Sequence, residues 1–280
     1  MLGGFLVLAA IAVASHRRPP ALDALRVHFL DVGQGDGIVV AGPGATLATL
    51  VDLPGRVSPP ALAQRVLTPV LRSAGLVGIE RIIASHADWD HAGGLGAVRE
   101  LYPDAEILVS RWNAATRAGR LLAQTSPRTV RHLAAGDGFA LGEARAEVLQ
   151  PAADSLGGRN DNSLVIVLAF GATRVLLTGD IERRAEEELR KLPELPGVSV
   201  LKVPHHGSRT SSGAALLARL RPTIAVAQLA GRNRFGFPHE EVVARYASFG
   251  TAWLSTAADG EVELVSDGQM ARLRSCRGTD

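Results

Sequence analysis

The sequence has little cysteine and little lysine: Cys276 is its single thiol, and Lys191 and Lys202 are its two lysines among 280 residues. One cysteine can form no disulfide within the chain and cannot build a cysteine-based metal site. The other basic residues are arginines, and the net charge is only +2, so composition predicts no strongly basic field. Arginine suits phosphate binding, but in a chain this rich in arginine and alanine the abundance more often reflects genome composition.

A long apolar run is also missing at the N-terminus. The uncharged run from Leu2 to Ala14 is shorter than the roughly 20 residues that span a bilayer, and no basic region precedes it as in a signal peptide. It is either a weak secretion or anchor signal or the end of a membrane helix that begins outside this chain. Pro19 and Pro20 break any helix here. We expect residues 1–20 to be a membrane-helix remnant or anchor plus linker, and residues 25–280 to form one folded domain.

Four side chains that commonly bind metal ions follow a short apolar run, Ile82 to Ala84, that is typical of a buried strand. Two imidazoles and two carboxylates at a strand end are costly to bury without a cation between them. A solvated polar turn would explain a single histidine beside an aspartate, but the combined spacing, followed by Gly93-Gly94, favours a metal site. The four side chains are His86, Asp88, Asp90 and His91.

Further candidate ligands come after other predicted strands. Asp180 follows a strand that ends in Gly179, although an aspartate that caps a helix would explain it equally well. His205 and His206 follow the next strand, and His239 stands at a predicted helix start, where capping is an equal alternative. Six nitrogen and oxygen ligands suit two divalent ions, zinc or manganese, that share a bridging carboxylate. This predicted set is His86, Asp88, Asp90, His91, Asp180 and His205.

The glycine-rich turn from Val32 to Gly37 superficially resembles a phosphate-binding loop. No helix pattern follows it, and no Gly-Lys-Ser/Thr is present, so the sequence excludes a nucleotide-binding P-loop here. Elsewhere strands alternate with single helices, and the ligand clusters follow strand ends, where α/β folds build their sites.

Together these motifs resemble the metallo-β-lactamase superfamily. The resemblance rests on Ser-His86-x-Asp88-x-Asp90-His91-x-Gly-Gly, Leu-Leu-Thr-Gly-Asp180 and Val-Pro-His205-His206-Gly-Ser. It implies an α/β (α+β) fold, a four-layered αββα sandwich with a dinuclear site at the edge of its sheets. The segments Phe29 to Asp36 and Asn233 to His239 make the chain similar to the C-terminal hydrolase domain of the ComEC family of DNA-uptake proteins. The similarity covers Leu25 to Val265.

The sequence departs from the superfamily pattern at several positions. Asp88 replaces the second histidine of the first motif, and Asp161-Asn162-Ser163 stands where another histidine is usual. One metal ion is therefore expected to be held weakly, with Asn162 or water completing its ligands. Asp90 and His239 are the predicted catalytic residues. His239 stands well after the ligand set, at a helix start beside Arg232 and Arg234, so we expect it to face the scissile phosphate rather than to hold a metal ion. Additional ligands or supporting residues are Asn162, His206, Asp36 and Asp52, and substrate-binding residues are Ser208, Arg232 and Arg234.

The resemblance also implies a function. Members of this branch are thought to degrade the DNA strand that is not transported, so we expect a metal-dependent phosphodiesterase or deoxyribonuclease acting on single-stranded DNA. Its partner would be a DNA-uptake channel, which could belong to the same parent polypeptide, on the extracytoplasmic side of a bacterial cell membrane. Two alternatives remain: a hydrolase of small phosphoesters or choline-phosphate groups, and a non-catalytic DNA-binding module. Trp112 and neighbouring arginines predict either a DNA-binding surface or a solvated helix face; these are Arg111, Arg117, Arg120, Arg128 and Arg131.

Overall fold

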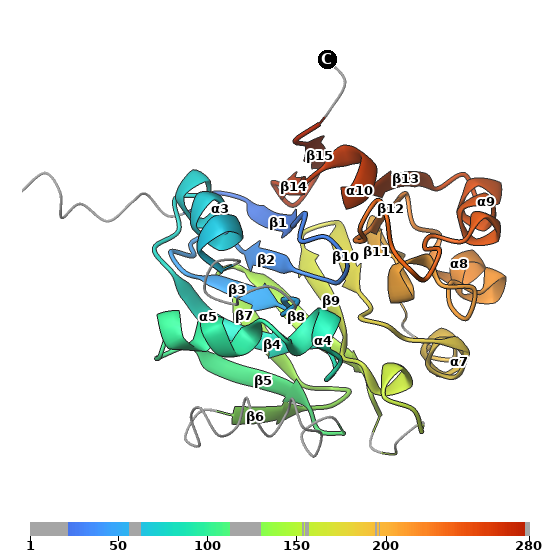
Figure 1. Cartoon of the computed structure of the whole chain (residues 1–280), viewed down its shortest axis with the longest axis horizontal. Coiled ribbons are helices and arrows are strands. Elements are labelled where there is room, and N and C mark those ends of the chain that lie inside the picture. Colours follow the sequence, from blue (N-terminus) through green and yellow to red (C-terminus); the bar gives the residue numbers. More distant parts are fainter. Residues whose placement is uncertain are drawn as a thin grey trace, which may run out of the picture.

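Figure 1 shows the computed structural model of the chain, which describes residues 22–55, 63–112, 130–152, 154, 157–193, 195 and 197–277. Two β-sheets pack face to face, and helices cover the outer face of each (Figure 1). The expected membrane-helix remnant and linker, residues 1–20, lie outside the described residues. None of the helices formed by the described residues has the length and apolarity needed to cross a bilayer.

The first sheet has eight strands in the order β15-β14-β1-β2-β3-β4-β5-β6. Its strands β3 to β6 run parallel, and the other neighbouring pairs are antiparallel. The strands are β1 (Leu25–Phe29), β2 (Ile38–Ala41), β3 (Ala48–Val51), β4 (Ile79–Ala84), β5 (Glu106–Ser110), β6 (Val130–Leu133), β14 (Val262–Ser266) and β15 (Ala271–Ser275).

The second sheet has seven strands in the order β13-β12-β11-β10-β9-β8-β7. Strands β10 to β13 are parallel, whereas β7, β8, β9 and β10 form antiparallel pairs. The strands are β7 (Gly138–Leu141), β8 (Ala144–Gln150), β9 (Val165–Phe170), β10 (Thr173–Leu177), β11 (Val200–Lys202), β12 (Ile224–Ala227) and β13 (Ala252–Ser255).

Helices form the two outer layers. On the first sheet lie the π-helix η1 (Ala63–Leu67), α3 (Thr68–Ser73) and α5 (Leu95–Leu101), and on the second lie α7 (Arg183–Arg190), α8 (Ala214–Leu220) and α9 (Glu240–Ser248). Short helices mark the loops: α4 (Trp89–Ala92), η2 (Asn160–Asn162), η3 (Pro204–Gly207) and α10 (Thr256–Asp259). The predicted αββα sandwich is confirmed.

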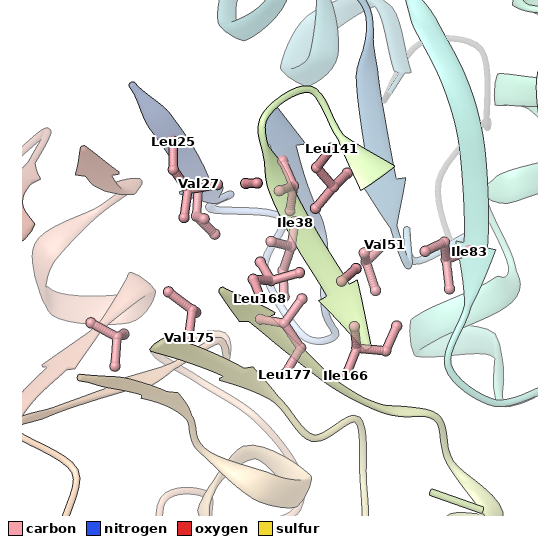
Figure 2. Close-up of a cluster of buried hydrophobic side chains, with 14 of the residues drawn as sticks. Leu25, Val27, Ile38, Val51, Ile83, Leu141, Ile166, Leu168, Val175 and Leu177 are labelled. Atoms are coloured by element: carbon pink, nitrogen blue, oxygen red, sulfur yellow. The ribbon is translucent and has the colours of Figure 1, made fainter. Parts of the chain in front are cut away.

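The continuous apolar strands are explained by burial on both faces, because successive side chains of a strand point to opposite sides. In β4, Ile82 packs under the helices of the first layer, whereas Ile83 points into the space between the sheets. In β10, Leu176 faces the helices of the second layer, and its neighbours Val175 and Leu177 face the other sheet. Figure 2 shows Ile83, Val175 and Leu177 among the side chains that fill this space. Each fully buried aliphatic side chain contributes about 1.5–3 kcal/mol.

The two sheets meet where β4 and β10 end. Leu164 N donates a 2.9 Å hydrogen bond to Ser85 O, which joins the segment before β9 to the loop after β4. Gly179, just after β10, has a φ of +52°, and a Cβ at this position would lie 2.9 Å from the Cβ of Ser163 and 3.1 Å from that of Ser85. Glycine is therefore required here both for its conformation and for the close approach, which brings the next residue, Asp180, beside the loop after β4.

Candidate metal centre

The centre is arranged around the carboxylate of Asp180, which is buried just after β10. Its Oδ2 atom lies 3.1 Å from His91 Nε2, 3.6 Å from His206 Nε2, and 3.9 Å from both His86 Nε2 and His205 Nε2. Two donors that each lie about 2.1 Å from one tetrahedral ion are roughly 3.4 Å apart. The imidazoles therefore surround this oxygen at spacings suited to shared metal ions.

Two further carboxylates lie at the edge of this group. Asp88 Oδ2 is 3.8 Å from His86 Nε2, and its other oxygen lies 2.7 Å from Arg159 Nη1. Asp90 Oδ2 is 3.8 Å from His206 Nε2. The structure thus brings together all six predicted ligands and adds His206, which the sequence had placed among the supporting residues.

The tandem histidines reach Asp180 through an unusual backbone. His205 and His206 have φ values of +47° and +54°, a left-handed conformation that costs roughly 1–2 kcal/mol for each residue with a side chain. His206 is buried and turns Nδ1 toward the carbonyl oxygen of Gln228, at 2.7 Å. His205 is partly exposed, with Nδ1 3.1 Å from Glu182 Oε1. Strain of this kind is concentrated at functional sites.

Hydrogen bonds fix which nitrogen of each buried imidazole faces the centre. His206 Nδ1 must donate, since its partner is a carbonyl oxygen, and His91 Nδ1 lies 2.9 Å from the carboxylate of Asp52. Ser85 Oγ donates to Asp52 and so accepts from His86 Nδ1, at 3.1 Å. In each neutral imidazole the lone pair then lies on Nε2, the atom that points toward Asp180.

The residues present fit divalent metal ions. The Nε2 atoms of His86 and His206 are buried and have no hydrogen-bond partner within the described part of the chain, an arrangement that costs free energy unless a ligand satisfies them. Burial, followed by the charge of His91, lowers the pKa of His86 to about 3, so this imidazole is neutral. Burial alone would lower the pKa of His91, but the charges of Asp180, Asp36 and Asp52 raise it well above its usual value, so without metal this imidazole is charged. Even with His91 charged, five carboxylates face three cations, an imbalance that divalent ions would correct. The carboxylates are Asp36, Asp52, Asp88, Asp90 and Asp180, and the cations are His91, Lys202 and Arg159.

Asp52 supports the centre from behind. It accepts hydrogen bonds from the backbone N–H of Ser85 at 2.7 Å, from Ser85 Oγ at 2.6 Å and from His91. Burial alone would raise its pKa, but the charge and hydrogen bond of His91, together with His86 and Ser85, lower the pKa below its usual value. A carboxylate behind a metal-binding imidazole fixes the orientation of the ring and increases its basicity.

Lys202 is fully buried at the end of β11, and no sequence motif predicts a role for it. Its ammonium forms an ion pair with Asp36, lies 3.5 Å from Asp180 Oδ1 and donates to Gly179 O at 2.9 Å. Burial alone would lower the pKa of Lys202, but the charges of Asp36 and Asp180 raise it. The ammonium therefore remains charged and fixes the side of Asp180 that faces away from the histidines.

The glycine-rich turn from Val32 to Gly37 has a structural explanation. Asp36 N donates to Asp90 O at 3.0 Å, and a Cβ on Gly35 would lie only 2.2 Å from that same oxygen. Gly35 also has a φ of +124°. The turn packs directly on the backbone of the first motif and delivers Asp36 to Lys202.

Other predicted site residues take different positions. Asn162 donates through Nδ2 to Gly158 O at 2.8 Å, and its neighbour Asp161 accepts from the backbone at the start of α7. Ser208 is buried and pairs with Thr210 at 2.9 Å within its own turn. Arg232 is exposed. The roles predicted for Asn162, Ser208 and Arg232 remain predictions.

His239 occupies the N-cap position of α9, and its Nδ1 accepts from Arg209 N at 3.2 Å. The ring of Phe237 lies 5.4 Å from that of His239 and 5.5 Å from that of His205, measured between centroids. Phe237 therefore lies between the rings of His205 and His239. A role for His239 in proton transfer remains a prediction.

A cleft of about 340 Å³ opens onto the centre. It includes Arg234, whose predicted role in substrate binding remains a prediction, and several residues not predicted to belong to the site. The described residues that line it are Gln34, Pro54, Asp88, Trp89, Asp90, Arg159, Asp180, His205, His206, Arg234, Phe235 and Phe237.

The arginine-rich segment is only partly described. Arg117, Arg120 and Arg128 lie outside the described residues. Trp112 Nε1 donates a 3.3 Å hydrogen bond to Ala152 O, and Arg131 Nη1 lies 3.7 Å from Glu106 Oε1. Neither of these two lines the cleft, so a DNA-binding surface in this segment remains a prediction.

Three curated relatives resemble the chain in sequence. It is 26% identical over 251 residues to ComE operon protein 3 of Bacillus subtilis (strain 168), and the matched region covers 85% of this chain and 32% of that protein. It is 32% identical over 240 residues to Recombination protein 2 of Haemophilus influenzae, and the matched region covers 85% of this chain and 28% of that protein. It is 30% identical over 250 residues to Competence protein ComA of Neisseria gonorrhoeae, and the matched region covers 88% of this chain and 33% of that protein. The chain spans about a third of the length of these relatives.

The fold is similar to that of the metallo-beta-lactamase fold protein YhfI from Bacillus subtilis, with a TM-score of 0.54 and 11% sequence identity over 82% of this chain and 95% of that one. Residues 30–231, which include all the predicted metal ligands, match the family described as the Metallo-beta-lactamase superfamily. The resemblance seen in the motifs is confirmed. The chain belongs to the metallo-beta-lactamase superfamily, whose metallo-hydrolase fold it shares.

Proposed function

We propose that this chain is a metal-dependent phosphodiesterase that hydrolyses single-stranded DNA. The observation that supports this most strongly is the position of Asp180 Oδ2 within 3.9 Å of four imidazole nitrogens at the end of an open cleft. Two divalent ions, zinc or manganese, would polarise the phosphate, lower the pKa of the attacking water and stabilise the charge that develops on the leaving oxygen.

We infer which residues would hold these ions. His86 and Asp88 would bind one ion, Asp90, His91 and His206 would bind the other, and Asp180 is close enough to the histidines of both groups to serve either ion. His205 remains in the ligand set, since its Nε2 is as close to Asp180 as that of His86. Asp52 and Lys202 orient the ligands from behind, because they contact His91 and Asp180.

Bound metal ions together with two arginines would favour an anionic substrate in the cleft. Arg234 and Arg159, the latter paired with Asp88, line it, and a guanidinium group binds phosphate oxygens through paired hydrogen bonds. The words "competence" and "recombination" in the names of two relatives support DNA as the source of that phosphate. We further propose that the domain acts on the extracytoplasmic side of a bacterial membrane beside a DNA-uptake channel, in one polypeptide with it.

Substrate comparison tests the proposal. The metal-loaded protein should cleave labelled single-stranded DNA faster than the same sequence as a duplex, and it should hydrolyse bis(p-nitrophenyl) phosphate. Asp180→Asn should remove both activities. Hydrolysis of p-nitrophenylphosphorylcholine without cleavage of DNA would support the small-ester alternative. Binding of DNA without hydrolysis of any diester would support a non-catalytic module.

A further inference from the structure

The rim of the metal cleft is rich in aromatic rings in a chain that has few of them. The sequence contains 3 Trp, 2 Tyr and 7 Phe residues, and three of these rings, Trp89, Phe235 and Phe237, line this one cleft. Trp89 is 54% exposed and Phe235 is 44% exposed. Large apolar side chains this open to water at a polar site need an explanation, because burial of each would stabilise the protein.

The two exposed rings are held differently. Trp89 stands between Asp88 and Asp90 at the start of α4, so its position is fixed relative to the metal ligands. Phe235 stacks on Phe237, with centroids 5.3 Å apart and planes inclined by 16°, and the guanidinium carbon of Arg234 lies 4.8 Å from its centroid. Phe235 is therefore part of a pre-assembled stack, whereas Trp89 has no ring or guanidinium partner of this kind among the described residues.

We infer that Trp89 is a stacking platform for an unpaired nucleobase next to the scissile phosphate, with the Phe235–Arg234 stack as the second wall. This inference rests on the proposed function and specifies its substrate class. A base stacked on Trp89 places its own phosphate beside Asp88 and Asp90. Bases in a duplex are already stacked and paired, so an aromatic platform selects single strands.

The charges at the rim favour a nucleobase over a quaternary ammonium group as the ligand of these rings. Aromatic rings also bind quaternary ammonium groups such as choline. Arg159 is paired with Asp88, and the carboxylates of the cleft are assigned to the metal ions, but Arg234 lies against the Phe235 ring at the rim. The guanidinium of Arg234 opposes a cationic group beside that ring and favours the phosphate attached to a base. The cleft, at about 340 Å³, lies at the lower end of the range for small-ligand pockets, which suits one nucleotide unit.

A comparison of normal and abasic DNA tests the inference. Two single-stranded oligonucleotides with the same number of phosphates, one carrying bases and one carrying tetrahydrofuran abasic sites, are compared by kcat/KM. Aromatic stacking is worth about 1–3 kcal/mol per base, or roughly 5- to 150-fold, so the wild type should prefer the base-bearing strand by a factor in this range. Trp89→Ala should bring the ratio of the two values close to one, and Trp89→Phe should retain much of the preference.

Phe249→Ala is the matched control, because Phe249 is also an exposed aromatic residue, at 40%, but does not line the cleft. It should keep the wild-type ratio. A second measurement compares thymidine 5′-monophosphate with deoxyribose 5-phosphate as inhibitors of bis(p-nitrophenyl) phosphate hydrolysis, and the nucleotide should bind more tightly only when Trp89 is present.

The outcomes separate this inference from the proposed function. Equal kcat/KM values for normal and abasic strands in the wild type would overturn the platform while leaving the phosphodiesterase in place. Loss of the preference in Trp112→Ala, with Trp89→Ala unaffected, would place base binding on the arginine-rich segment and also overturn it. A protein that hydrolyses no diester in the presence of zinc or manganese would overturn the proposed function itself.

Discussion

Replacing Lys202 by methionine should destabilise the protein strongly, because the change removes one partner of a buried ion pair and leaves the others. Lys202 is fully buried, and its ammonium contacts Asp36, Asp180 and Gly179 O. Breaking such a pair costs about 3–5 kcal/mol. Since 1 kcal/mol changes Tm by about 2–4 °C in a domain of this size, the metal-free Lys202→Met protein should melt roughly 6–20 °C below wild type in differential scanning calorimetry.

The chain supplies its own control. Lys191, the other lysine, is exposed at the end of α7, and its pairs with Glu187 and Glu188 are solvent-exposed, so Lys191→Met should cost less than about 1 kcal/mol. Adding Asp36→Asn to Lys202→Met should recover part of the loss, because it removes one of the unpaired buried charges. A Lys202→Met protein that melts within 2 °C of wild type would refute the ion-pair argument. No recovery in the double variant would show that Asp36 is not the coupled partner.

Three further predictions concern the centre and the stability of the fold. Asp52→Asn should lower metal affinity about 10–100-fold, measured by titration against a chromogenic chelator, because it removes an oxygen that orients His91; unchanged affinity would contradict that role. His239→Ala should lower kcat on DNA more than on bis(p-nitrophenyl) phosphate and leave metal content at the wild-type level, as expected for a general acid; loss of metal would instead make His239 a ligand, and equal losses on both substrates would argue against proton donation. Burial raises the pKa of Glu186 to about 7 from 4.5, so its contribution to stability is present below pH 4.5 and is lost as pH rises through 7. Between pH 4 and 8, wild type should therefore lose about 3 kcal/mol of unfolding free energy relative to Glu186→Gln in urea titrations, and parallel pH profiles would contradict the burial argument.

The sandwich could be predicted from the sequence because its signals are local. Runs such as Ile82 to Ala84 are apolar on consecutive residues, as required of strands buried on both faces. The first motif places four ligands within six residues directly after a strand, so the sequence alone shows that they lie close together. Asp180 required only a strand end and a glycine, and the structure gives both.

The remaining features depend on contacts between distant segments. Lys202 precedes the tandem histidines in the sequence, but its partner Asp36 comes from a turn more than 160 residues earlier, and nothing in the local pattern marks a lysine for full burial. The turn itself has the composition of a phosphate-binding loop, and its close packing on Asp90 is visible only in three dimensions. Trp89 stands in the first motif, but the two rings that line the same cleft, Phe235 and Phe237, come from the far end of the chain.

The most direct test of the central claim combines metal content with activity in one pair of proteins. Wild type and Asp180→Asn, both stripped with a chelator and reloaded with zinc or manganese, would be assayed for bound metal by mass spectrometry and for cleavage of single-stranded DNA. We expect about two ions per chain and metal-dependent cleavage in the wild type, with both reduced in Asp180→Asn while the circular dichroism spectrum is unchanged. Cleavage of DNA by wild type that survives complete removal of metal, or an Asp180→Asn protein with full metal content and full activity, would contradict the account.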